Sequence, residues 1–520
     1  MHEQLGVVLN STLMVLLAPT LVVLILGIIS RLRRKPYPPG PRGLPIIGNL
    51  MMADQLNHRG LAKLAQSYGG LFHLKMGFVH MMVVSSPEVA RQVLQVQDNI
   101  FSNRPETIAI NYLTYGGADF VFAHCGPFWR MMRKLSVMRL FSRKRTETWQ
   151  SVRDEVDHIV KVLSGRVGSP VNIGEHVFNL TKNVIYRAAL GTKMSDGQDK
   201  FLAVLQELSQ LFGALNIADY IPLLKWADPN GLSDRLVKAR STLGGFIDPI
   251  IDDHLKKKKA VNGHVKQENK VEDDFDIVDE LLNFYTEDDK VHQQDSQDIK
   301  LTRNNIKAII MDITFGATET VAWTIEWAIT ELLSNPEYMD RVQQELTRVV
   351  GLNRRVEESD LDKLPFFKCC MKETLRLHPP IPLLLHATSN DAIIGGQYYI
   401  PKQSQVLVNT WAIGRDPNSW SDPDRFKPER FLDESAPEIK GKDFEFIPFG
   451  SGRRSCPGMG LALFTLEICA VNLLHCFTWE LPDGMKPSEL NMDETFGLTI
   501  SKMSRLVAVP SHRLLCPLNS

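Results

Sequence analysis

One cysteine lies in a loop rich in glycine and arginine near the carboxyl end of the chain. The loop reads Phe-Gly-Ser-Gly-Arg-Arg-Ser-Cys-Pro-Gly over residues 449–458, and an apolar run with helical spacing follows over 461–477. Cys456 is therefore expected near the amino terminus of a helix. Free backbone N–H groups and the helix dipole stabilise a thiolate at such a position. The pattern predicts that Cys456 is kept for chemistry.

A single thiolate restricts the kind of metal centre that this loop can build. A structural zinc site needs four protein ligands, and the chain contains no C-x-x-C pair. One thiolate is enough as the axial ligand of a haem iron. In that case Gly452 and Gly458 let the backbone approach a flat macrocycle, and the Arg454 guanidinium pairs with a haem propionate. The alternative, a buried inert cysteine, does not explain the glycines and arginines.

A second chemical pattern lies in the middle of the longest predicted helix. This helix begins after Thr302, a suitable N-cap, and ends near Leu333, before an Asn-Pro pair. Its residues 316–320 read Gly-Ala-Thr-Glu-Thr, a poor choice for a helix interior. A local violation in an otherwise good helix indicates function. The alternative is a threonine that only bonds back to the preceding turn.

The overall composition is that of a folded globular protein. The 520 residues are 44% hydrophobic and 23% charged, with a net charge of −1. These values exclude a disordered chain and argue against a general nucleic-acid binder. Length alone suggests about three domains at roughly 150 residues each. The seven cysteines indicate no disulfide framework, and six are predicted to be reduced bystanders: Cys125, Cys369, Cys370, Cys469, Cys476 and Cys516.

The elements that must position these motifs are mostly helices. Strand patterns are short and occur at 71–84, 392–400 and 405–408. The sequence thus predicts a mainly α fold with small β-sheets. Residues 256–300 open with four lysines. They are predicted to be a linker made of a loop and a short polar helix, and not a binding site.

The first 35 residues differ from the rest of the chain. Residues 7–29 contain no charged side chain, and a helix of about 23 residues spans about 34 Å, enough to cross a bilayer core. Four basic residues follow at 31–35, so the positive-inside rule places the body of the chain in the cytosol. A cleaved signal peptide is the weaker alternative because the apolar run is too long. The prolines that come next predict a stiff extended spacer.

The cysteine loop resembles the haem-binding motif of the cytochrome P450 family. The family pattern F-x-x-G-x-R-x-C-x-G is met by Phe449, Gly452, Arg454, Cys456 and Gly458. At average residue frequencies, a chance match in a chain of this length occurs about once in 10,000. The resemblance implies a cytochrome P450 fold with an N-terminal transmembrane helix. It also implies that Cys456 binds the haem iron, with Phe449, Arg454 and Gly458 around the cofactor.

Other marks of this family occur in order along the chain. Glu373 and Arg376 match its E-x-x-R pair, and Arg430 supplies the partner arginine. By itself an i,i+3 pair is a weak surface ion pair, whereas the resemblance implies a buried structural triad behind the haem. The resemblance also implies three contacts to the haem propionates: Trp129, Arg133 and His386.

The resemblance gives the long helix a role in a monooxygenase reaction. Ala317 lies beside the oxygen site, and Glu319 and Thr320 deliver the protons that cleavage of the O–O bond requires. Two rival classes are a haem-thiolate isomerase or lyase and a non-enzymatic haem sensor. The first typically departs from the acid–threonine pattern or from the cysteine loop, and the second needs neither. The chain keeps both, which favours a monooxygenase.

The electrons must come from another protein, because the chain has no dinucleotide-binding fingerprint. The expected donor is a membrane-bound NADPH–cytochrome reductase. A basic stretch made of Lys134, Arg139, Arg143, Lys144 and Arg145 is a candidate docking face, the alternative being a solvated cationic surface. The expected organisation is an anchor (1–30), a basic and proline-rich spacer (31–48) and one haem-thiolate monooxygenase domain (49–520) in the endoplasmic reticulum membrane, facing the cytosol.

Several stretches resemble plant members of the family that hydroxylate ferulate and coniferaldehyde. They include residues 52–60, 101–105, 226–229, 354–360 and 481–487. The implied reaction is NADPH- and O2-dependent 5-hydroxylation of guaiacyl phenylpropanoids such as ferulate, coniferaldehyde and coniferyl alcohol, in syringyl lignin biosynthesis. A flavonoid B-ring hydroxylase is the alternative. By family position, the substrate pocket is expected from residues 108–122, 311–320, 381–385 and 496–500.

Overall fold

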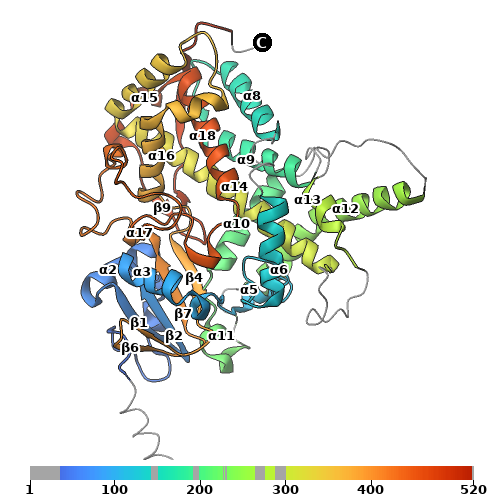
Figure 1. The fold of residues 1–520 in the computed structure, drawn as a ribbon, viewed down its shortest axis with the longest axis vertical. Coiled ribbons are helices and arrows are strands. Elements are labelled where there is room, and N and C mark those ends of the chain that lie inside the picture. The colour runs from blue at the N-terminus through green and yellow to red at the C-terminus, as the bar shows by residue number, and fades with distance from the viewer. Residues whose placement is uncertain are drawn as a thin grey trace, which may run out of the picture.

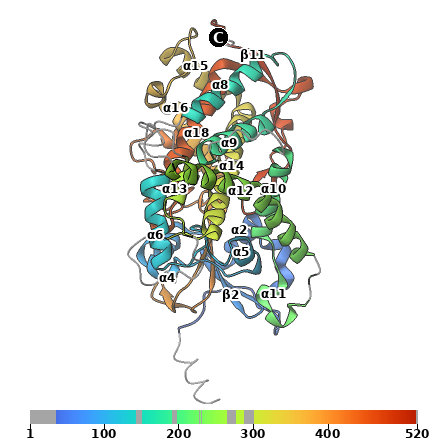
Figure 2. The same cartoon turned by 90° about the vertical axis from the view of Figure 1, so that its right-hand side faces the viewer.

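The protein is described by a computed structural model that covers residues 35–141, 150–190, 198–226, 228, 231–263, 276–286 and 300–517. Within these residues it is mainly helical with four small sheets, as the sequence predicts. The expected membrane anchor at 1–30 lies outside the described residues. Both views place the largest sheet toward one end of the molecule and most of the long helices toward the other (Figures 1 and 2).

The largest sheet has four strands in the order β1-β2-β7-β4. Strand β2 pairs in parallel with β7, and the other neighbours are antiparallel. The strand patterns predicted at 71–84, 392–400 and 405–408 are all confirmed, the first two as hairpins. The strands are β1 (Leu71–Met76), β2 (Val79–Val84), β3 (Val171–Asn172), β4 (Leu383–Ala387), β5 (Ala392–Ile394), β6 (Tyr398–Ile400), β7 (Gln405–Asn409), β8 (Phe477–Glu480), β9 (Glu494–Thr495), β10 (Ser501–Lys502) and β11 (Val507–His512).

The long helix α14 (Arg303–Ser334) crosses the helical part of the molecule (Figure 1). It begins as predicted, because Thr302 and Asn305 form a reciprocal capping box. Most of its side chains are buried, since α9, α16 and α18 all pack against it. The longer helices around it are α2 (His58–Tyr68), α6 (Pro127–Leu135), α8 (Gln150–Ser164), α9 (Ile173–Leu190), α10 (Gln198–Gly213), α12 (Leu232–Gly263), α15 (Pro336–Val349), α16 (Pro365–Leu377) and α18 (Met459–Cys476).

Helix α18 follows the cysteine loop and belongs to the core. Among the described residues it alone is long and apolar enough to cross a membrane, but 67% of its most apolar window is buried inside the protein. It packs against α14, α8, α15 and α16. Its hydrophobicity is therefore explained by burial between other helices.

The predicted linker at 256–300 is wrong in its first part. Helix α12 continues through the lysine run to Gly263, because lysine is a good helix former. The second element, α13 (Ile277–Leu282), is not polar, since four of its six side chains are buried. Residues 264–275 and 287–299 lie outside the described part of the chain.

The proline-rich segment lies against the sheet at its start. The carbonyls of Pro36 and Pro39 accept hydrogen bonds from the amides of Tyr399 and His73, at 2.9 and 2.8 Å. The Tyr37 ring stacks on His73 and His80, with a centroid distance of 5.1 Å to each. The segment has no regular secondary structure, and these contacts fix its direction where it meets the folded body.

A buried ion triad joins α16 to the segment that leads toward the cysteine loop. Arg376 donates two hydrogen bonds of 2.7 Å to the two carboxylate oxygens of Glu373, and Arg430 donates a third of 3.0 Å. The side chains of Glu373 and Arg376 have no exposed area. Arg376 also donates to the carbonyls of Pro423 and Arg425. The triad is therefore structural and buried, as the family resemblance implies.

Replacing Glu373 by Gln leaves two guanidinium groups without their buried carboxylate. We expect Glu373→Gln to destabilise the protein by about 3–5 kcal/mol, the usual result of breaking a buried ion pair. Chemical denaturation of the haem-loaded protein measures this loss. The matched control is Glu438→Gln, which removes an exposed pair with Lys440 and should cost less than about 1 kcal/mol. Equal stability of the two variants would contradict the assignment.

Candidate active site

A cavity of about 270 Å³ lies between α14, the cysteine loop, α18 and strand β4. Nine of the ten predicted site residues line it: Trp129, Arg133, Ala317, Thr320, His386, Phe449, Arg454, Cys456 and Gly458. They come from four segments that are far apart in the sequence: α6, α14, β4 and the cysteine loop. Glu319 is the exception and does not reach the wall.

The cysteine loop is a tight turn that presents its thiol to the cavity. The Cys456 amide donates to the Phe449 carbonyl at 2.9 Å, which closes the turn, and α18 begins three residues later. Gly450 and Gly452 both have φ +68°, where glycine is preferred. A Cβ on Gly452 would lie 1.9 Å from the carbonyl oxygen of Leu94. Gly452 is thus needed to pack against the chain behind the loop.

The Cys456 side chain is exposed, but the space it faces is the internal cavity. Burial in the protein interior raises its pKa, while the Gly458 amide and the Arg133 charge act in the opposite direction. The predicted lowering by the helix terminus is therefore outweighed by desolvation. Metal coordination deprotonates a thiol outright, so a bound metal ion is what makes this thiol a thiolate.

Several cations line the same cavity. The Arg454 guanidinium lies 4.3 Å from the Trp129 ring centroid and donates to the Ser102 carbonyl at 2.8 Å. Arg133 donates to the Ser455 hydroxyl at 3.2 Å. Burial and the neighbouring Arg104 charge lower the pKa of Arg454 to about 8. A carboxylate beside these arginines would oppose that shift.

His386 is held in one orientation. Its Nδ1–H donates to the Phe101 carbonyl at 2.9 Å, so Nε2 is the atom left for the cavity. Burial and the charges of Arg104 and Arg454 lower its pKa to about 3. Nε2 donates a hydrogen bond only when the ring is protonated, and an anionic partner favours that state.

Arg104 also lines the cavity, and the sequence analysis did not assign it a role. It is half-buried and donates to the carbonyls of Val121 and Leu385. The sequence did contain a clue to Arg104, because it belongs to the segment 101–105 that resembles plant members of the family. Arginine matches carboxylate geometry, so Arg104 adds to the cationic wall.

These residues fit a haem group. Haem needs an apolar slot, one axial ligand, and cations for its two propionates. Cys456 faces the cavity as a lone thiol. Within the described part of the chain, Arg133 and Arg454 form no ion pair with a carboxylate and bond instead to a hydroxyl and to backbone carbonyls. Buried cations without anions call for an anionic ligand.

The α14 wall shows different roles for the two residues that were predicted to deliver protons. The Thr320 hydroxyl faces the cavity and donates to the Gly316 carbonyl at 2.6 Å. Thr320 thus bonds back to the preceding turn and also lies at the cavity wall. Glu319 is buried on another side of the helix, where the Thr499 hydroxyl donates to its carboxylate at 2.6 Å. Burial raises the pKa of Glu319 to about 7.

Every predicted pocket range contributes to the cavity, each by only part of its length. The contributing residues are 120–122, 311–313, 315–317, 320, 381, 383–385 and 498. Four of the lining residues that the sequence did not predict come from α9 and α10: Thr181, Val184, Ile185 and Phe212. They carry no motif, and only packing of these helices against the cavity brings them there.

The comparison with known families decides the identity of this fold. The cytochrome P450 family model matches residues 38–507. The chain belongs to the cytochrome P450 family.

Individual relatives cover nearly the whole chain. It is 62% identical over 500 residues to cytochrome P450 84A1 of Arabidopsis thaliana, covering 95% of each chain. It is 38% identical over 491 residues to a flavonoid 3'-monooxygenase of Petunia hybrida, covering 92% of this chain and 93% of the relative. The fold matches a zebrafish cytochrome P450 solved with progesterone, with a TM-score of 0.72 at 27% identity, covering 88% of this chain and 99% of that one.

As a cytochrome P450, the chain is a haem-thiolate monooxygenase. The family uses haem iron, dioxygen, a small-molecule substrate and a reductase that draws electrons from NADPH. The rival classes of isomerase, lyase and haem sensor are thereby set aside.

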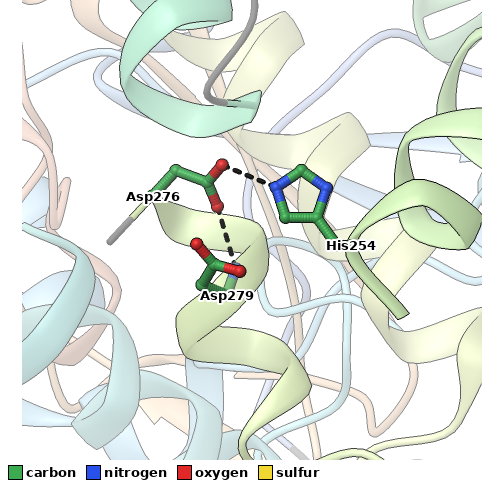
Figure 3. A group of neighbouring side chains, drawn as sticks. All are labelled: His254, Asp276 and Asp279. Atoms are coloured by element: carbon green, nitrogen blue, oxygen red, sulfur yellow. Dashed lines mark hydrogen bonds and ion pairs between the residues drawn. The ribbon is translucent and has the colours of Figure 1, made fainter. Parts of the chain in front are cut away.

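A second group of possible metal ligands lies outside the P450 cavity. Figure 3 shows His254 of α12 beside Asp276 and Asp279 at the start of α13. Nε2–H of His254 donates to Asp276 at 2.7 Å, and Nδ1–H donates to the Ile250 carbonyl at 2.8 Å. A ring with both nitrogens donating is a cation and has no lone pair for a metal. The group is a clamp between two helices.

We expect this clamp to depend on pH. The hydrogen bond to Asp276 raises the pKa of His254 above its usual value. Its stabilisation is therefore complete below pH about 6.5 and is lost as pH rises through the raised folded-state pKa. Hydrogen exchange of the α13 amides, corrected for intrinsic rates, should accelerate between pH 6 and pH 8.5. His254→Gln should remove this pH dependence, whereas His124→Gln, at an exposed histidine, should keep it. A rise in melting temperature with added zinc ions would contradict the clamp.

Proposed function

We propose that this cytochrome P450 hydroxylates the 5-position of the aromatic ring of guaiacyl phenylpropanoids such as ferulate, coniferaldehyde and coniferyl alcohol, on the route to syringyl lignin. The observation that carries the proposal is an aromatic cluster in the cavity wall. The Phe122 and Phe212 rings stack with a centroid distance of 4.9 Å, and Phe315 lies 5.7 Å from Phe212. Such rings favour a planar aromatic substrate. The resemblance of several sequence stretches supports the same substrate class.

In this proposal Cys456 would bind the haem iron through its sulfur, and Phe449 and Gly458 would contact the macrocycle. The cationic wall holds the two propionates through Arg133, Arg454 and His386, with the Trp129 ring against Arg454. Bound haem supplies the activation of dioxygen and the transfer of one oxygen atom to the substrate. The protein's own task is to exclude water and to place the substrate ring over that centre.

Proton supply is proposed to run along α14. Ala317 leaves space at the cavity wall, and Thr320 places a hydroxyl there. Glu319, with a pKa raised to about 7, exchanges protons near neutral pH. Because its carboxylate faces Thr499 and not the cavity, it serves as a proton source behind the helix, and Thr320 makes the last transfer.

Thr320→Ala tests this assignment. We expect the variant to keep its haem spectrum while product formed per NADPH falls at least about tenfold and hydrogen peroxide rises in its place. The matched control is Thr318→Ala, because Thr318 makes the same bond back to its helix, to Thr314 at 2.6 Å, and does not line the cavity. Unchanged coupling in Thr320→Ala, or equal uncoupling in the control, would refute the role.

The substrate is tested with a panel of ferulate, coniferaldehyde, coniferyl alcohol and a flavanone, incubated with reductase and NADPH. We expect 5-hydroxylated phenylpropanoids as products. Cys456→Ala is the inactive control and should lack the carbon-monoxide difference spectrum of a thiolate-ligated haem. A normal spectrum in that variant would overturn the ligand assignment. Turnover of the flavanone alone would favour a flavonoid B-ring hydroxylase, the alternative supported by the 38% identity to a flavonoid 3'-monooxygenase.

We also propose that the protein is anchored in the endoplasmic reticulum membrane by residues 1–30 and receives electrons from the membrane-bound NADPH–cytochrome reductase. The uncharged run at 7–29 and the basic residues after it support the anchor. Of the basic stretch expected to dock the reductase, Lys134 is exposed in α6, and residues 143–145 lie outside the described part of the chain.

A further inference from the structure

Two buried aspartates meet at the edge of the P450 cavity, where α14 faces residues 119–122. The Asp312 carboxyl accepts hydrogen bonds from the amides of Phe120 and Val121, at 3.1 and 3.2 Å. The Asp119 carboxyl accepts one from the amide of Phe122 at 2.8 Å. The two side chains therefore hold three consecutive amides, which form the part of the cavity wall that carries Phe120 and Phe122.

One carboxyl oxygen of this pair has no donor. Oδ1 of Asp119 is buried and finds no N–H or O–H group among the described residues, yet the Asp119 and Asp312 side chains lie within hydrogen-bonding contact of each other. Two ionised carboxylates at this distance repel, and a lone pair buried without a donor is costly. A proton on Asp312 resolves both problems because it is donated to Oδ1 of Asp119.

We propose that Asp119 and Asp312 share one proton and act as a positioning pair that fixes residues 119–122 over the substrate pocket. The proposal rests on the proposed function only in taking this cavity as the pocket for an aromatic ligand. Asn305 holds the same segment from α14, through a hydrogen bond of 2.9 Å to the Ala118 carbonyl. The Phe122 ring placed in this way stacks on Phe212.

The charges around the pair are consistent with one proton. The charge of Arg104 interacts with both carboxyls, and that of Arg454 with Asp119. The charge of Arg133 acts on Arg104 and Arg454. Burial and the neighbouring Asp119 charge raise the pKa of Asp312 well above its usual range. The pair then carries one negative charge against Arg104, which leaves Arg133 and Arg454 for the two haem propionates. Loss of the shared proton at alkaline pH sets two anions against each other and releases the segment.

The test is the affinity of the haem-loaded protein for 4-phenylimidazole, a neutral aromatic azole above pH 7, followed by its shift of the haem absorption band from pH 6.5 to 9.5. We expect the wild-type dissociation constant to rise about tenfold between pH 7 and pH 9, as the binding-competent fraction falls. Asp312→Asn keeps the two amide bonds and supplies a permanent N–H donor to Asp119. It should match the wild type at pH 7 and stay within about twofold at pH 9.

Three variants make the result decisive. Asp312→Ala should bind weakly at every pH. Asp219→Asn is the matched control, since Asp219 accepts a bond from the Ile108 amide at 2.8 Å and no carboxyl among the described residues acts on it. This variant should keep the alkaline loss. If Asp312→Asn does not retain haem, Asp119→Asn offers the same donor from the other side and should give the same flat profile.

A flat wild-type profile, or an Asp312→Asn protein as weak as Asp312→Ala at pH 7, would overturn the shared proton. The azole titration does not depend on the natural substrate. Failure of coniferaldehyde turnover at pH 7 alongside the expected azole profile would therefore contradict the proposed function and leave the carboxyl pair standing.

Discussion

The buried ion triad around the Glu373 carboxylate is the interaction on which the position of the cysteine loop depends. The carboxylate is buried and shared between two guanidinium groups, one on its own helix and one on Arg430, just ahead of the segment that leads to the cysteine loop. Buried charges are tolerated only when they are fully paired. The pairing therefore fixes how α16 and residues 423–430 lie against each other. The loop that presents Cys456 starts from that fixed base.

The cavity beyond the loop has the opposite electrostatic character. Its Arg133 and Arg454 side chains bond to a hydroxyl and to backbone carbonyls, and neither forms an ion pair with a carboxylate within the described residues. The Cys456 thiol in the same cavity is desolvated, which raises its pKa. Both features are unfavourable in an empty protein and become favourable with a group that brings a metal ion and two carboxylates. The arginine charges and the Cys456 thiol are therefore complementary to the propionates and the iron of haem.

Helix α14 presents different residues of the site on different faces. Thr320 lies at the cavity wall, and its neighbour Glu319 points toward Thr499 and the C-terminal segment, because adjacent residues on a helix lie about 100° apart. About two turns earlier, the Asp312 carboxyl contacts the segment at 119–122. The same helix thus places a hydroxyl at the cavity, a buried acid on another face, and a carboxyl against the segment at 119–122.

Sequence alone determined the local features of this protein: the cysteine loop, the capped start of α14, the hairpins and the E-x-x-R pair, since each is encoded by residues close together in the chain. It misjudged features that depend on surroundings. Desolvation outweighs the helix terminus at Cys456, and the lysine run continues α12. Only the tertiary structure decided that Thr320 and not Glu319 meets the cavity, that Phe212 of α10 completes its aromatic wall, and that Asp119 lies against Asp312. These are contacts between distant segments, and their burial and charge follow from packing that no local pattern specifies.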